Sequence, residues 1–196
     1  MRTRTIRTAL AVAAMTVVAN AMSGRAATSN PTPGTAVSSA VAVERGKYLV
    51  NAMGCHDCHT PWKMGPNGPG PDMSRPLSGH PSDLVMPPPP KLTAPWGWSA
   101  AATNTAFAGP WGVSFTANLT PDPETGLGKW TADTFIATMK TGRHEGKGRR
   151  LLPPMPYPML ASLSDEDIRS VFSYLQSLPP IRNRVPAPID PPDAQK

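Results

Sequence analysis

The sequence has little charge and few aromatic residues: charged residues make up 16% of its 196 residues and aromatic residues 6%. It is rich instead in residues that interrupt regular structure, with 26 prolines and 16 glycines. This composition predicts that much of the chain is loop rather than helix or sheet. A chain of this length has room for one ordinary domain, so we expect a compact core with long proline-rich connections.

Most of the excess positive charge lies at the N-terminus. The formal net charge is +6, but four of the basic residues lie in the first 27 positions, namely Arg2, Arg4, Arg7 and Arg25. The rest of the chain has 15 basic against 13 acidic residues. This balance does not predict nucleic-acid binding.

No apolar run is long enough to span a bilayer easily. The stretch from Ala9 to about Val18 is shorter than the roughly 20 residues that a transmembrane helix needs. Arginines precede it and small residues follow it, which is typical of a cleaved secretory signal over residues 1–27. An uncleaved, tilted anchor is the alternative. We therefore expect an exported, periplasmic protein with no stable membrane span after cleavage.

The remaining chain is expected to form a linker, a domain and a tail. Residues 28–40 are small and polar and predict a flexible linker. The domain covers residues 41–180 and contains a long insert, residues 61–115, rich in proline, glycine and tryptophan. Residues 181–196 form a proline-rich tail that is expected to run over the surface or fray. The aromatic residues expected to anchor the insert on the core are Trp96, Trp98, Phe107, Trp111 and Phe115.

Apolar residues at helical spacing predict three helices in the domain. The first ends at Gly54, which stands where a left-handed cap is expected. The second begins near Thr131 and stops near Gly142. The third follows Ser164, which resembles the start of a capping box, and ends before Pro179.

The residues Cys55, His56, Asp57, Cys58 and His59 form the motif CxxCH. Two thiols three residues apart can reach the two vinyl groups of one haem, while the adjacent histidine reaches its iron. We therefore predict one haem c per chain, bound covalently through Cys55 and Cys58, with His59 as an iron ligand.

Three other interpretations of this motif are open. A thioredoxin-like redox site belongs in a strand-rich α/β unit, and no such pattern precedes Cys55. A structural zinc site normally draws its second ligand pair from a distant segment, where His80 and His144 are isolated. A plain disulfide between Cys55 and Cys58 is the third interpretation, since an exported chain can form one.

The motif and its surroundings resemble class I c-type cytochromes, in which helices pack around a haem carried on CxxCH. The matching segments run from about Glu44 to Leu178. More narrowly, NLTPDPETGLG from Asn118 to Gly128 and PMPY at 154–157 resemble haem domains of dehydrogenase-associated cytochrome c subunits. Those subunits usually carry several CxxCH motifs, whereas this chain has one. The resemblance implies an all-α, cytochrome c-like fold around a covalently bound haem.

The resemblance also implies a second axial ligand from a loop before the last helix. Met155 lies in that loop with proline on either side, which stiffens the backbone that would hold a weakly binding thioether. Met155 is our predicted ligand and Met159 is its rival. Met86, His144 and an open or water-bound site are further alternatives.

Other residues around the expected haem have simpler interpretations. Met53 and Met139 fall on apolar helix faces and are expected to pack in the core, whereas His56, His80 and His144 are expected to be solvated. For the second nitrogen of His59, the resemblance implies a backbone carbonyl acceptor at a Gly-Pro step, for which Pro66 and Pro71 qualify. Candidate partners for buried haem propionates are Arg143, Arg149, Arg150, Trp96, Trp98 and Trp111.

A haem with histidine and methionine ligands predicts electron transfer rather than catalysis. The expected function is to shuttle single electrons between periplasmic redox proteins, such as a dehydrogenase and a terminal acceptor. One alternative is a peroxidase-like haem enzyme with an open distal site shaped by the insert. Another is a non-catalytic subunit docked permanently to a dehydrogenase, which an exposed aromatic patch would support.

Overall fold

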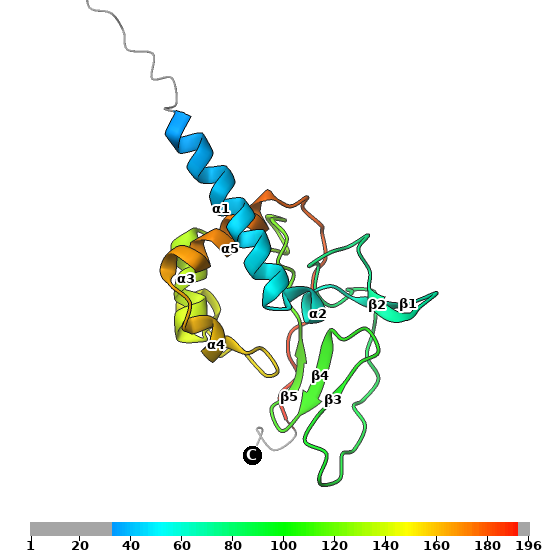
Figure 1. Cartoon of the computed structure of the whole chain (residues 1–196). Coiled ribbons are helices and arrows are strands. Elements are labelled where there is room, and N and C mark those ends of the chain that lie inside the picture. The colour runs from blue at the N-terminus through cyan, green and yellow to red at the C-terminus, as the bar shows by residue number, and fades with distance from the viewer. Residues whose placement is uncertain (1–32, 192–196) are drawn as a thin grey trace, which may run out of the picture. The chain divides into compact units, whose positions relative to one another are not determined.

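A computed structural model describes residues 33–191, with side chains from residue 39 onward. Three helices form one side of this part of the chain, and the insert with its short strands forms the other (Figure 1). The expected signal segment, residues 1–27, lies outside the described residues. Within them, no helix is both long enough and apolar enough to cross a membrane.

The first and last helices, α1 (Pro33–Ala52) and α5 (Asp165–Ser177), cross in close contact. Gly46 makes this possible, because a Cβ at that position would overlap the backbone carbonyl of Ser170. The α5 helix begins as predicted: the Ser164 hydroxyl accepts a hydrogen bond from the Asp167 amide at 3.1 Å. Around the crossing lies a core of buried apolar side chains, including Leu49, Val50, Ile168, Val171, Phe172 and Leu175.

The α3 helix (Ala132–Thr141) completes the helical core. Thr131 caps its start by accepting a hydrogen bond from the Thr134 amide at 3.1 Å, and Gly142 ends it in a left-handed conformation. Phe135 faces Phe172 of α5 with ring centroids 5.4 Å apart. Both predicted ends of this helix are therefore confirmed. Two short elements follow it, the 3-10 turn η1 (His144–Gly146) and the helix α4 (Tyr157–Ala161).

The start of α1 differs from the prediction. The helix begins at Pro33, so residues 33–40, which we expected to belong to a flexible linker, are helical. Proline is favourable in the first turn of a helix, and the alanines that follow have high helix propensity. The predicted end is confirmed, because Gly54 is left-handed at φ 66° and turns the chain into α2 (Cys55–His59).

The insert contains regular structure, although its composition predicted mainly loop. Its first part is a hairpin of β1 (Trp62–Gly65) and β2 (Gly68–Pro71). Its second part is an antiparallel sheet in the order β3 (Ser99–Ala100), β4 (Ala106–Gly109), β5 (Gly112–Phe115). Residues 72–98 between them contain no helix or strand.

The aromatic anchors predicted for the insert are only partly correct. Phe107 is buried, and Phe115 and Trp111 are partly buried, but Trp96 and Trp98 are 74% and 48% exposed. Polar side chains contribute anchors instead. His80, predicted to be solvated, is fully buried: one ring nitrogen lies 2.9 Å from the Thr105 hydroxyl, and the other 3.1 Å from the Leu84 carbonyl.

The C-terminal segment does not fray over residues 181–191, which we call the C-terminal strap. Val113 of β5 and Ile189 exchange two backbone hydrogen bonds, at 2.8 and 2.9 Å. Gly112, with φ 88°, permits the approach, since a Cβ there would overlap the Ile189 carbonyl. Of the two predicted behaviours, fraying is therefore wrong for these residues and a course over the surface is confirmed, since most of them are exposed. The edge strand of the insert offers them backbone partners.

Candidate functional site

The CxxCH motif forms the short helix α2 between α1 and the insert. Cys55 and Cys58 are both free thiols and form no disulfide with each other. Burial raises the pKa of Cys55 to about 11 and also raises that of Cys58. Both sulfurs are therefore neutral thiols near pH 7. Among residues 33–191, no three or more His, Cys, Asp and Glu side chains gather as a metal site.

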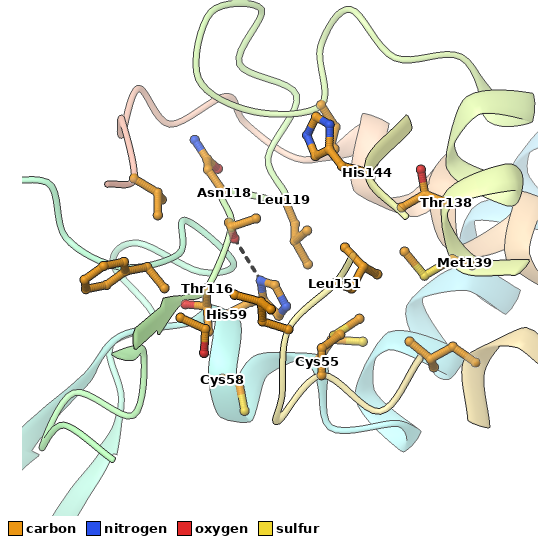
Figure 2. Close-up of a pocket in the computed structure, with 18 of the residues that line it drawn as sticks. Cys55, Cys58, His59, Thr116, Asn118, Leu119, Thr138, Met139, His144 and Leu151 are labelled. Carbon is orange, nitrogen blue, oxygen red and sulfur yellow. Dashed lines mark hydrogen bonds between the residues drawn. The ribbon is translucent and has the colours of Figure 1, made fainter. Parts of the chain in front are cut away.

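His59 is held by a backbone carbonyl on the far side of the insert. Burial lowers its pKa, so the imidazole is neutral. Its Nδ1 donates to the carbonyl oxygen of Ala117 at 2.8 Å (Figure 2). The Nε2 lone pair is then free to bind a metal. The expected acceptor at Pro66 or Pro71 was wrong: those prolines lie in the β1–β2 hairpin, whereas the segment after β5 passes beside His59.

A cavity of about 680 Å³ opens between the helices and the insert. Its volume lies within the range of about 300–1,000 Å³ that small-molecule and cofactor sites occupy. Both cysteines and His59 line it, and most of its wall is apolar. Figure 2 shows the motif on one side of this space and Leu151, Met139 and His144 on other sides. The C-terminal strap contributes a further wall through residues 184–188.

The candidates for the second iron ligand differ in whether they line the cavity. Met155 lines the same cavity as His59. Its rival Met159 lies on α4, is 53% exposed and is not part of the cavity wall. Met86 also lies outside the wall, in the loop between β2 and β3. His144 is exposed as expected but reaches the cavity as well, with its ring edge-on to Trp130 at 5.2 Å.

The predictions for the remaining histidines and methionines are partly confirmed. Met53 and Met139 pack against the core as predicted, and both also line the cavity. His56 is partly buried rather than solvated, and its Nδ1 lies 2.9 Å from the Thr60 hydroxyl. This contact ties the motif to the start of the insert.

The polar part of the cavity wall differs from the sequence-based expectation. Of the arginines proposed for haem propionates, Arg149 lines the cavity, whereas Arg143 and Arg150 do not. Trp96, Trp98 and Trp111 also lie outside the wall. Sequence reasoning missed several residues, because only the folded chain brings them to the cavity; they are Thr116, Trp130, Thr138 and Arg184. The Thr116 hydroxyl is buried and has no hydrogen-bond partner among the described residues.

The sequence profile of the cytochrome c family matches residues 43–179. The chain belongs to the cytochrome c family. This match takes in the motif, the cavity-lining helices and the insert, so the cytochrome c-like fold predicted from the resemblance is confirmed. Membership implies covalently bound haem c and a role in electron transfer.

Similar proteins are components of bacterial dehydrogenases. A subunit of the nicotinate dehydrogenase of Pseudomonas putida is 31% identical over 89% of this chain and 12% of its own length. The cytochrome c subunit of a quinone-dependent alcohol dehydrogenase from Gluconobacter oxydans is 26% identical over 67% of this chain and 20% of its own. The fructose dehydrogenase cytochrome subunit of Gluconobacter japonicus is 26% identical over 78% and 24%. The chain thus matches a quarter or less of each of these relatives.

The cavity fits a haem of this type on its own chemistry. Two thiols three residues apart and a neutral imidazole lie on one side of a largely apolar space. A thioether from Met155 belongs to the same wall, and two arginines offer positive charge for the two carboxylates of haem. All the donor types that a c-type haem uses are present.

Proposed function

We propose that this chain is a monohaem c-type cytochrome that carries single electrons between periplasmic redox proteins. The observation that supports this best is that Cys55, Cys58, His59 and Met155 line one cavity, although Met155 is almost a hundred residues from the motif. In this proposal, the cysteines hold the haem covalently. His59 and Met155 would ligate its iron, and the chain would have no catalytic step of its own.

Haem, when bound, supplies an iron that alternates between ferric and ferrous states by one electron. The chain's residues set how easily that change occurs. The Ala117 carbonyl fixes the ring orientation of His59 and makes its Nε2 a better donor. Met155, as a soft thioether, favours the ferrous state and raises the reduction potential. The apolar wall excludes water, so little solvent has to reorganise.

Dehydrogenases are the proposed electron donors, since the similar proteins are named as dehydrogenase subunits. The acceptor would be a further redox protein on the way to a terminal oxidant. Export rests on the N-terminal pattern of residues 1–27. The chain would then acquire its haem in the periplasm.

The first test is an absorption spectrum of the full chain, produced with haem-maturation machinery, in the oxidised and reduced states. Sharp reduced low-spin bands, with the weak near-infrared band of ferric iron bound to methionine sulfur, are the expected result. High-spin bands that respond to peroxide or carbon monoxide would contradict it and favour the peroxidase-like alternative.

The Met155 assignment has a matched control in Met159. We expect Met155→Ala to keep the covalent haem, lose the near-infrared band and lower the reduction potential, because the thioether ligand is gone. Met159→Ala should leave spectrum and potential unchanged, since that side chain is exposed. The reverse pattern would assign the ligand to Met159. No change in either variant would contradict both assignments, and a low-spin wild type without the near-infrared band would favour His144.

Covalent attachment is tested by the double variant Cys55→Ala/Cys58→Ala. It should carry no haem after denaturing electrophoresis and haem staining. It should also lose its near-ultraviolet circular dichroism, because a large cavity then remains in a small core. A stable, folded protein without haem would contradict the second expectation, and retained covalent haem the first.

A permanently docked dehydrogenase subunit is a second candidate, favoured by the insert surface. We call residues 84–98 the insert loop. Its exposed apolar side chains are Leu84, Val85, Leu92, Trp96 and Trp98. Lys91 is its one charged residue, so a partner there would bind through apolar contacts and with little salt dependence.

This second candidate predicts that the tagged full chain co-purifies from its own periplasm with an identified dehydrogenase in equimolar amount. Val85→Ser/Trp96→Ser should lose the dehydrogenase but keep its haem. Val41→Ser, which changes an exposed apolar residue of α1, should retain it. A monomeric haem protein at both low and high salt would contradict permanent docking and leave the shuttle as the function.

A further inference from the structure

The C-terminal strap forms part of the cavity wall. Five consecutive strap residues, 184–188, line the same space as His59 and Met155. One of them, Arg184, is charged. The sequence had suggested only a proline-rich tail here, and no cofactor role followed from that pattern.

The strap is fixed to the domain immediately before Arg184. Asn183 is 2% exposed, and its side-chain amide donates to the carbonyls of Ser78 at 2.6 Å and His80 at 2.8 Å. Its side-chain oxygen accepts from the Ser82 amide at 2.9 Å. Its backbone amide donates to the Thr125 hydroxyl at 3.0 Å. With every polar group of this amide satisfied, the backbone at position 183 has little freedom.

The strap is fixed again after Arg184. Ile189 pairs with Val113 of β5 through both of its backbone groups. The segment between these two anchors is Arg184 to Pro188, and two of its residues are prolines with restricted backbones. The backbone of Arg184 is therefore held rigidly at the cavity, whereas its side chain is exposed.

The charge of Arg184 has no obvious structural partner. It forms no ion pair with any residue in the described part of the chain, whereas Arg182, two residues earlier, pairs with Glu124 at 2.8 Å. The other arginine of the wall, Arg149, donates only to a neighbouring backbone carbonyl. Haem brings two carboxylates into a largely apolar space, and such groups need compensating charge.

We propose that Arg184 is the counter-charge for a haem carboxylate, and that the C-terminal strap serves to hold it there. This inference rests on the proposed haem site. The positive charge keeps the carboxylate ionised and offsets its negative field at the iron. Electron uptake is then easier, so the strap raises the reduction potential. Arg184 is a positioning residue, since the electron never passes through it.

The test compares two exposed arginines in the haem-loaded full chain, Arg184 of the cavity wall and Arg150, which lies outside it. Arg184→Gln should keep its low-spin spectrum, and at low ionic strength its ferrous-to-ferric ratio at a fixed ambient potential should fall about three- to tenfold. Arg184→Lys should recover part of this change, because it restores the charge without the planar fork. Arg150→Gln changes net charge equally and should shift the ratio by much less, because Arg150 lies outside the cavity wall.

The pH dependence of the potential gives a second readout. In the wild type, the carboxylate stays ionised and the potential should be nearly constant from pH 5 to 8. In Arg184→Gln the pKa of the carboxylate rises, so a pH-dependent step should enter this range. A merely structural role for Arg184 would not produce such a step. Other titratable groups, His144 and Glu124, also line the cavity. A step of equal size in the wild type and in Arg184→Gln would therefore come from one of them and would overturn the inference.

Equal shifts in Arg184→Gln and Arg150→Gln would also overturn the inference, because only total charge would then matter. So would an unchanged potential in Arg184→Gln. The proposed function fails separately, if the wild type carries no covalent haem or shows a high-spin, ligand-reactive spectrum. A wild type with the expected spectrum and an unaltered Arg184→Gln would refute only the role of Arg184.

Discussion

The helical side of the molecule and the insert side are held together by different interactions. Around α1, α3 and α5 the buried side chains are mainly apolar, and they belong to one cluster. In the insert, in the residues that flank it and in the C-terminal strap many are polar, among them Thr60, Ser78, His80, Thr105, Asn118, Thr120 and Asn183. A proline-rich loop cannot satisfy its own carbonyls through regular backbone pairing. Buried side-chain donors do so instead. They hold the insert in one conformation although it contains no helix.

The largest expected effect comes from the helix crossing. Gly46→Ala should destabilise the haem-loaded protein by about 3 kcal/mol, because the new Cβ overlaps the Ser170 carbonyl. Hydrogen exchange should then rise across α1, α3 and α5 together. Thermal unfolding and exchange mass spectrometry measure the two effects.

Gly112→Ala is the matched change on the insert side. Its Cβ overlaps the Ile189 carbonyl, and its φ of 88° is strained for alanine. We expect exchange to rise mainly in residues 106–115 and 181–191, with α5 still protected. Equal loss of protection in α5 would show that the two sides unfold as one unit.

The next effect concerns the buried amide that joins the strap to the insert. Asn183→Ala should cost about 2–3 kcal/mol, because it leaves the carbonyls of Ser78 and His80 buried without their donor. Asn51→Ala on the exposed face of α1 is the control, and should change stability by less than about 0.5 kcal/mol. Chemical denaturation of the haem-loaded variants measures both. Similar values for the two would argue against polar anchoring of the strap.

A smaller effect should appear on acidification. Burial lowers the pKa of His80 below 6.5, while the Leu84 carbonyl and Asp83 act in the opposite direction. The folded chain thus binds this proton less readily than the unfolded chain. Its stabilisation is complete above about pH 6.5, and at most about 1.4 kcal/mol is lost per pH unit as pH falls towards the folded pKa.

Hydrogen exchange at pH 7 and pH 5, corrected for intrinsic rates, can locate this acid effect. Opening should increase around residues 77–84 and 103–116 and much less in α5. His80→Gln should remove the acid sensitivity, because an amide does not titrate. His56→Gln should keep it, although the pKa of His56 is also lowered by burial. Acid sensitivity that disappears only in His56→Gln would place the titrating group in the motif.

Local sequence was enough to predict the helical side and the attachment motif. The caps at Thr131, Gly142 and Ser164 depend on groups only a few residues away, and apolar spacing fixes the helix faces. The haem-binding groups of Cys55, Cys58 and His59 likewise lie within five residues, so their spacing can be read from the sequence. The start of α1 was missed, because a small, polar stretch with several alanines is compatible with both linker and helix.

Only the tertiary structure decided what surrounds that motif. The acceptor for His59 is Ala117, 58 residues away, and Asn183 reaches the carbonyl of His80 across 103 residues. Hydrogen bonds of this kind leave no periodicity in the sequence, because a carbonyl acceptor belongs to every residue and its use depends on where the chain passes. The burial of His80, the presence of Arg184 at the cavity and the absence of Met159 from the cavity wall all follow from that path. The sequence determined which groups can bind a haem, and the fold determined which of them meet.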